Sequence, residues 1–409
     1  MQNTVNDLKT SVQPFISVNT LRMTLILGAL AALGPLSIDM YLPALPGLAK
    51  DLHTNAPLAQ LSLTFFLLGL SFGQLFSGPL SDFRGRRTPL LIGLIVYTAS
   101  SLLCALAPSV WVLIILRLIQ GLAGAAGIAI SRAIVRDLYS GPEMTKFMSR
   151  LMLVMGLAPV LAPIAGGQLL RVTSWHGVFI VLTVLGIGLV LAVFFGVPET
   201  LPVDRRSKGG IRNTFATMRG LICDRVFMGY ALSQGFVSAA LFAYISGSPF
   251  VLQNIFGVSP QLFSLLFAIN SLGIIFASQV TGRLAGRVSE KGLFIAGIGM
   301  SFIGGIALIA FILTKAGLAL MLPPMFLVVS SVGMVNAAGF SLAMQNQSKA
   351  AGSASGLLGV LSFVSGAFAA PLVGLGGGHS AIPFGTVIAA ASTGAVLCYI
   401  FLARRVTKG

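Results

Sequence analysis

Apolar stretches of about 20 to 28 residues recur along the whole chain, separated by short polar segments. Each stretch is long enough to cross the ~30 Å hydrocarbon core of a bilayer as a helix, which rises about 1.5 Å per residue. Only 9% of the 409 residues are charged, whereas a typical globular chain carries about 25%. So little charge cannot cover a water-exposed surface. We therefore predict an all-α polytopic membrane protein with twelve transmembrane helices.

The hydropathy pattern places these spans near 21–48, 58–80, 88–107, 110–136, 144–170, 176–197, 226–253, 261–283, 290–314, 318–342, 351–377 and 381–403. Most of the 26 Lys and Arg residues then fall on one side of the layout, and the other side holds Lys50, Arg171 and Lys315. Basic loops stay in the cytoplasm. We expect a bacterial cytoplasmic (inner) membrane protein with both termini inside. The net charge of +16 is thereby explained without a nucleic-acid partner.

The longest polar stretch divides the spans into six and six. We expect a cytoplasmic N-terminus over 1–20, six-helix halves over 21–197 and 226–403, a cytoplasmic linker over 198–225, and a cytoplasmic tail over 404–409. A short repeat favours two pseudo-symmetric halves, because Gly69 and Gly78 match Gly273 and Gly282 at one offset. Two such halves, rocking about a central cavity, can give alternating access.

The chain has ten acidic residues, of which nine fall in loops or at the ends of predicted spans, and only Asp39 lies inside one. A carboxylate at bilayer depth is costly when charged and unpaired, so such residues usually face water-filled cavities and serve ion or proton traffic. Asp39 is thus the first candidate for proton coupling. The alternative is structural: a carboxyl group that only caps backbone groups freed by Pro35 and Pro43.

Arg117 is the base placed deepest within a predicted span, at about the same depth as Asp39. We expect the two to be electrostatic partners in proton coupling, directly or through water or Gln120. The rival interpretation is that Arg117 only pins helices together.

Asp82 and Arg86 lie in a dense charged loop after the second span, and Asp137 lies near the same side of the membrane at the end of the fourth. We expect these three to form a conformational latch. The alternative is that this basic loop only orients the protein in the membrane.

Other residues are candidates for gating and substrate contact. Pro159 and Pro163 bend a helix by freeing backbone carbonyls, and Gly156 precedes them, so these three are gating candidates. The C-terminal half offers neutral polar and aromatic side chains suited to an amphiphilic ligand. The substrate-cavity candidates are Tyr41, Gln120, Gln234, Tyr244, Asn270 and Asn336.

The chain resembles the major facilitator superfamily, of the drug:proton antiporter type, over nearly its whole length. Three segments are similar to motifs of that family, in which the arginine of the second is associated with proton transfer: Gly78 to Arg87, Leu116 to Gly121, and Gly156 to Gly167. Segments 37–46, 198–201 and 246–250 look like the bicyclomycin and chloramphenicol resistance (Bcr/CflA) branch. In that branch the acid at the position of Asp39 is implicated in substrate and proton binding. One arginine of the first motif is displaced here to Arg84, which puts its family role in doubt.

This resemblance implies a secondary active transporter that exports drug-like or amphiphilic small molecules in exchange for protons. The expected partners are a small-molecule substrate, protons and the lipid bilayer, with no cofactor beyond the proton gradient, no metal, and a monomeric state. An importer or exporter of a specific metabolite or sugar with the same fold is the first alternative. A membrane sensor or enzyme is the second, but the chain shows neither a nucleophile–base–acid constellation nor a nucleotide loop.

Overall fold

The computed structural model describes residues 20–139, 141–206, 219–345, 347, 351–376 and 380–403. Twelve helices in it are long and apolar enough to cross a membrane, so the predicted all-α fold with twelve spans is confirmed. The helices are α1 Thr20–Asp39, α2 Leu45–Asp51, α3 Ala56–Arg84, α4 Arg87–Ala105, α5 Val110–Leu138, α6 Gly141–Leu169, α7 Trp175–Gly196, α9 Arg225–Phe250, α10 Pro260–Leu284, α11 Glu290–Leu313, α12 Leu318–Met344, α13 Ala351–Gly374 and α14 Ile382–Cys398.

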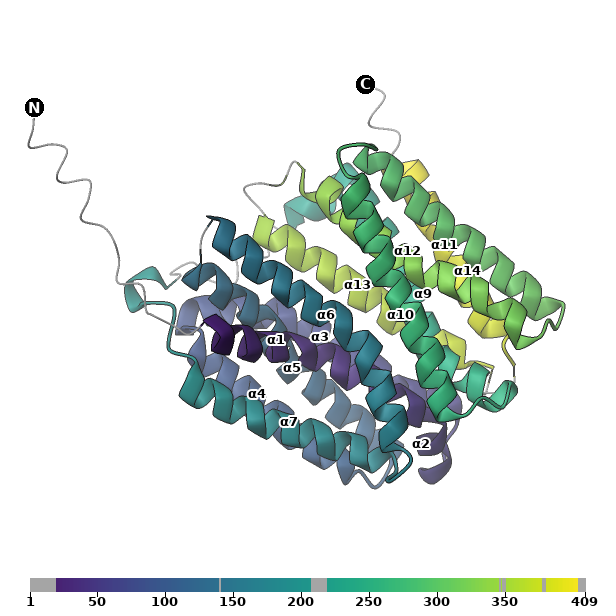
Figure 1. Cartoon of the computed structure of the whole chain (residues 1–409), viewed down its shortest axis with the longest axis horizontal. Helices are drawn as coiled ribbons and strands as arrows, with labels where there is room; N and C mark the ends of the chain where they lie inside the picture. The colour runs from purple at the N-terminus through teal and green to yellow at the C-terminus, as the bar shows by residue number, and fades with distance from the viewer. Residues whose placement is uncertain are drawn as a thin grey trace, which may run out of the picture.

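The six N-terminal spanning helices, α1 and α3 to α7, lie together, and α9 to α14 form a second group beside them (Figure 1). The predicted terminal segments 1–20 and 404–409 lie almost entirely outside the described residues, as do 207–218 of the predicted linker. The exact domain boundaries therefore stay a prediction. Large apolar side chains such as Phe195, Phe276 and Phe368 are exposed on the outside of the bundle, where a membrane protein meets lipid.

The first span is interrupted, where the sequence predicted one helix over 21–48. Helix α1 ends at Asp39, and after a turn the chain forms a short 3-10 helix, Leu42–Ala44, followed by α2. Pro43 and Pro46 occupy the first turns of these two elements, where the missing proline N–H costs no helical hydrogen bond. The break places Asp39 at a helix end instead of in a helix interior.

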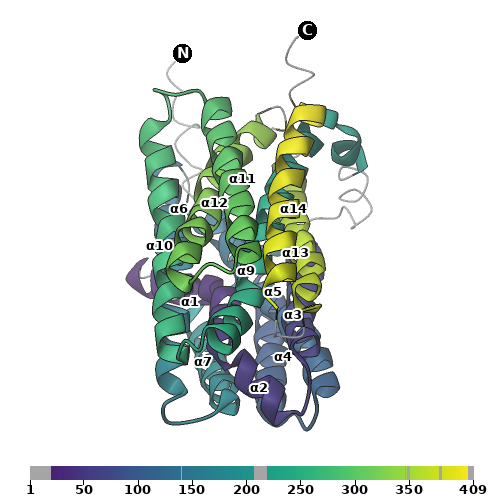
Figure 2. The ribbon, with the colours of Figure 1, turned by 90° about the vertical axis from the view of Figure 1, so that its right-hand side faces the viewer.

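The two ends of the bundle differ. At one end, which we call the basic end, α3 ends at Arg84, α4 begins at Arg87 and α5 ends at Leu138. At the opposite end lies α2 (Figure 2). Three glutamine side chains join the two helix groups near the opposite end, donating from Nε2 to backbone carbonyls: Gln60 to Ser246 at 3.0 Å, Gln253 to Pro43 at 3.3 Å and Gln261 to Gly167 at 3.0 Å. The opposite end is thus closed by contacts between the groups.

Two helix crossings bring backbone against backbone, one in each group. A Cβ atom at Gly121 of α5 would lie 2.2 Å from the Phe66 carbonyl oxygen of α3. A Cβ atom at Gly333 of α12 would lie 2.1 Å from the Ile274 carbonyl oxygen of α10. Glycine permits this approach, which is common between membrane helices.

Candidate transport cavity

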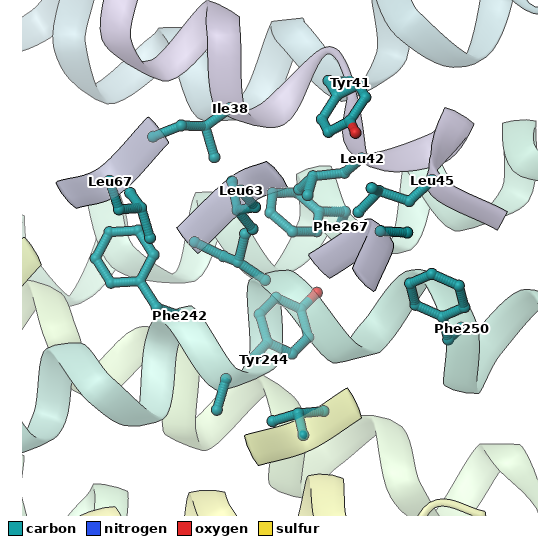
Figure 3. Close-up of a cluster of buried hydrophobic side chains, with 14 of the residues drawn as sticks. Ile38, Tyr41, Leu42, Leu45, Leu63, Leu67, Phe242, Tyr244, Phe250 and Phe267 are labelled. Carbon is teal, nitrogen blue, oxygen red and sulfur yellow. The ribbon is translucent and has the colours of Figure 1, made fainter. Parts of the chain in front are cut away.

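A cavity of about 250 Å³ lies between the two helix groups. Its walls are mostly apolar and include Leu70, Ile128, Phe242, Phe267 and Phe363. Figure 3 shows the same region: Ile38 and Leu67 of the N-terminal helices lie near Phe242, Tyr244 and Phe267 of the C-terminal helices. An apolar cavity with few polar groups suits an amphiphilic ligand.

Asp39 lines this cavity and is 4% exposed. It is the one acid among the lining residues that the structure describes. Within the same described part of the chain, its carboxylate takes part in neither an ion pair nor a side-chain hydrogen bond. The end of α1 therefore delivers a carboxyl group into an apolar space where a ligand or a proton can meet it.

Arg117 is fully buried, but its partners differ from those expected. It donates to the Gln120 Oε1 atom at 2.6 Å and to the Ser37 carbonyl at 3.0 Å. Its guanidinium lies over the ring of Phe66, 4.1 Å from the centroid, and near the ring of Tyr41 at 5.0 Å. The direct ion pair with Asp39 is not formed, because α1 ends there and presents the backbone of Ser37, not the carboxylate, to Arg117. Nor does Gln120 bridge the two.

The substrate-cavity candidates separate into two sets. Tyr244 lines the cavity, and its hydroxyl accepts a hydrogen bond from Asn270 Nδ2 at 2.7 Å, so Asn270 holds a cavity wall from behind. The others stand away from the lining, each with a partner of its own: Tyr41 with Ser62 at 2.7 Å, Gln120 with Ser101 at 2.7 Å, and Gln234 with Asn336 at 2.9 Å.

The gating candidates lie on α6, which remains helical through both prolines. Pro159 lines the cavity, whereas Pro163 is buried and stands outside the lining. Gly156 faces α10, where a Cβ atom would lie 3.7 Å from Ile275. Helix α6 thus borders the cavity and packs against the other group.

A second cavity, of about 380 Å³, lies at the basic end and includes the predicted latch residues. Arg86 is 6% exposed and donates through Nε to Asp137 at 2.8 Å, and its NH1 group also contacts Asp82. Although burial alone lowers it, the pKa of Arg86 is raised by the hydrogen bonds to Asp137 and Asp82 and by their charges. The expected contacts among these three residues are present.

Sequence reasoning gave Glu199 no site role, yet it completes this cluster. Its carboxylate accepts from the backbone N–H groups of Arg86 at 2.8 Å and Arg87 at 3.2 Å. Burial opposes ionisation of Glu199, but these backbone hydrogen bonds and the charge of Arg206 hold its pKa below the usual value. Gly85 adopts φ +92°, and a Cβ atom there would lie 2.5 Å from Glu199. Gly85 thus leaves room for the carboxylate.

Among the described residues, the contacts of the Arg86 cluster lie within residues 81–206, so in this conformation they tie N-terminal helices to one another and to the start of the segment after α7. The displaced Arg84 is exposed at the end of α3 and lies away from the cluster's described contacts.

Arg132 is a further residue that sequence reasoning passed over, because it was counted with the basic side of the fourth span. It lines both cavities, as does Gln74 of α3. The signal was available: Arg132 lies inside the predicted span 110–136, one helical turn before Arg136.

Comparison with known proteins identifies the family. Residues 27–370 match the family described as Major Facilitator Superfamily. The chain is 45% identical over 370 residues to an uncharacterized MFS-type transporter, YdgK, of Bacillus subtilis, covering 90% of this chain and 92% of that one. It is 32% identical to a bicyclomycin resistance protein homolog of Haemophilus influenzae, covering 95% and 98%.

The solved structures agree on the fold. The xylose transporter XylE from E. coli, in a partially occluded inward open conformation, matches with a TM-score of 0.72 at 16% identity over 95% of this chain and 99% of that one. At this identity the likeness concerns the fold alone. With its twelve spans and a family match over most of its length, the chain belongs to the major facilitator superfamily and is a multi-pass secondary transporter, not an enzyme.

Proposed function

We propose that this transporter exports drug-like or amphiphilic small molecules across the bacterial cytoplasmic membrane in exchange for protons. The observation that carries the proposal is Asp39, an acid with neither ion pair nor side-chain hydrogen bond in the described part of the chain, at the wall of an apolar cavity. An intramembrane carboxyl group facing a cavity is typical of proton and ion pathways. Relatives named for bicyclomycin, chloramphenicol and multidrug resistance support the direction of transport and the Bcr/CflA branch.

The charge distribution supports an orientation with the basic end and both termini in the cytoplasm. The closed opposite end then faces outward, and the basic-end cavity opens toward the cytoplasm. In this state a substrate would enter the apolar cavity from the cytoplasmic side. Rocking of the halves 21–197 and 226–403 would later expose the cavity outward.

Asp39 would bind the proton in this scheme, and Arg117 would act as a positioning residue. Arg117 holds the Ser37 carbonyl two residues before Asp39, and its Gln120 bond and surrounding rings fix it in place. The guanidinium thereby sets the position of the end of α1. Movement of α1 during transport would change these contacts and the surroundings of the carboxyl group together.

The remaining candidates would serve conformational change. The cluster of Asp82, Arg86 and Asp137 would make the basic ends of the N-terminal helices move as one body. Its ion pairs would break, or new ones form, as the two halves close at that end. The α6 segment with Gly156, Pro159 and Pro163 would bend at the cavity wall, because proline leaves carbonyls of the preceding turn without their helical partners.

The test uses cells that lack their own efflux pumps and express the wild type, Asp39→Asn, or the control Asp51→Asn. Asp51 accepts a hydrogen bond from Trp175 Nε1 at 3.1 Å, outside the cavity. The wild type and the control should lower susceptibility to a panel of amphiphilic drugs, and collapse of the proton gradient should abolish the effect. Asp39→Asn should confer none at equal expression.

Everted membrane vesicles complete the test, because drug-driven proton release can be followed there with a pH-sensitive dye. Proton-coupled transport retained by Asp39→Asn would refute the assignment of Asp39. Unchanged susceptibility across the whole panel would instead favour a specific metabolite as the substrate.

A further inference from the structure

Arg132 and Gln74 stand where the two cavities meet. Both side chains line the apolar cavity and the basic-end cavity. Arg132 comes from α5 and Gln74 from α3, and these two helices cross backbone to backbone. A molecule passing from the basic-end cavity into the apolar one would meet both side chains on its way.

One buried donor nitrogen of each side chain lacks an acceptor among the described residues. The Nε atom of Arg132 and the Nε2 atom of Gln74 are both shielded from solvent and make no hydrogen bond within the described residues. The hydrogen bond that Arg132 does make goes to the sulfur of Met155, at 3.7 Å, and a thioether is a weak acceptor. Arg86, by contrast, binds two carboxylates. Buried donors without acceptors are costly, so an acceptor supplied by a ligand would be favoured here.

Asp39 and Arg132 occupy opposite ends of the apolar cavity. Gly34 of α1 lies against Ile128 of α5, where a Cβ atom would approach the Ile128 side chain to 2.8 Å. The two helices run antiparallel, so that Asp39 is five residues toward the opposite end and Arg132 is four residues toward the basic end. At 1.5 Å per residue, their Cα atoms are about 13 Å apart along the helix axes. The space between them is apolar.

We propose that Arg132 and Gln74 bind the carboxylate of an amphiphilic substrate whose apolar body lies in the cavity between them and Asp39. The planar guanidinium presents a fork of donors that matches a carboxylate, and the Gln74 amide adds another donor. The substrates of this transporter are then amphiphilic acids and zwitterions that carry a carboxylate. The distance to Asp39 leaves the proton site free while the acid is bound. This inference rests on the proposed export function for its physiological meaning.

The test is a pair of probes of almost equal shape, 2-naphthylacetate and 2-naphthylacetamide, titrated against the purified full chain in lipid nanodiscs by calorimetry. The wild type should prefer the acid. Arg132→Gln should weaken binding of the acid about 10-fold or more, as expected for loss of a charge-assisted hydrogen bond, and should change binding of the amide less than about twofold. Gln74→Leu should weaken binding of the acid by a smaller factor.

Arg136→Gln is the matched control, since Arg136 lies one turn further along α5, is exposed and lines only the basic-end cavity of the two. This variant removes the same charge and should keep the preference for the acid. Arg132→Lys, which retains the charge but not the fork, guards against a variant that fails to fold, and should keep part of the preference.

Four results would overturn the proposal: equal affinity of the wild type for both probes, binding of neither, an equal loss for both probes in Arg132→Gln, or loss of the preference in Arg136→Gln. The third would mean that Arg132 is structural, and the fourth that only the general positive potential acts. Binding needs no proton gradient, so the outcome is separable from that of Asp39→Asn. A preference without drug export would refute the proposed function alone, and export without the preference would refute this inference alone.

Discussion

The close approach of α3 to α5 at Gly69 yields a prediction whose size can be worked from the structure. A Cβ atom at Gly69 would lie 2.3 Å from the Leu118 carbonyl oxygen and 2.8 Å from the Leu122 nitrogen. Both are backbone atoms inside a helix, so neither can move alone. Ordinary van der Waals contact begins near 3.4 Å, so Gly69→Ala would push the two helices apart by about 1 Å.

Two effects of this substitution oppose each other. Overpacking of this kind costs about 1–3 kcal/mol, whereas replacing a helical glycine by alanine gains about 0.8–1 kcal/mol in helix propensity. Gly188→Ala, in the middle of α7, is the control, because a Cβ atom there would meet nothing within 4 Å. Both variants share the propensity gain. We therefore expect Gly69→Ala to be less stable than Gly188→Ala by about 1–3 kcal/mol.

Thermal unfolding of the purified variants in the same detergent measures this difference. Gly69→Ala should melt below the control, and the proposed export should fall too, since Leu118 adjoins Arg117 and a shift of α5 would disturb the bond from Arg117 to the Ser37 carbonyl of α1. If Gly69→Ala melts at or above Gly188→Ala, α3 and α5 do not cross as closely as described.

Three further predictions concern the charged clusters. The pKa of Glu199 is lowered in the folded protein, so its ionised carboxylate stabilises the fold above the unfolded pKa of about 4.3, and this stabilisation is lost as the pH falls below that value. Melting temperatures measured against pH should therefore fall less steeply on the acid side for Glu199→Gln than for the wild type. An identical dependence of melting temperature on pH would contradict the prediction. Arg117→Lys cannot reach Gln120 and the backbone of α1 together, and we expect it to cost about 1–3 kcal/mol in melting experiments and to slow efflux. Arg86→Ala leaves Asp137, whose side chain is 15% exposed, without its cation; limited proteolysis at the basic end should speed up, and equal rates would argue against the cluster holding these helices.

Much of the architecture follows from the sequence, because membrane insertion depends on properties that each segment carries by itself. Length and apolarity fix the number of spans, and the distribution of Lys and Arg predicts the orientation. The contact between Arg86 and Asp137 could be predicted for a similar reason. Only a few charged residues lie at the helix ends on one face of the membrane, so few pairings are possible. A buried arginine among them needs a carboxylate partner.

The partners of buried polar residues could not be predicted, because they depend on helix rotation and on local breaks in the helix. Arg117 and Asp39 match in depth, but depth leaves the direction of each side chain open. The end of α1 at Asp39 turns the carboxylate toward the cavity and leaves the Ser37 carbonyl for Arg117. Gln234 likewise donates a hydrogen bond to Asn336, which a sequence cannot reveal when the two residues are 102 positions apart.

Arg132, the proposed carboxylate site, illustrates how counting charges by membrane side can hide candidate functional residues. A topology argument treats every arginine near the cytoplasmic end of a span as an orienting charge, and such a charge needs only water or lipid headgroups as neighbours. Arg132 instead lies against Met155 at the wall of an apolar cavity, with a shielded Nε atom. An orienting charge gains nothing from that position, since Arg136 one turn away is exposed and would suffice. The cost of placing Arg132 there is offset if a substrate carboxylate completes its hydrogen bonds, so a base held at an apolar wall indicates the substrate group that the cavity selects.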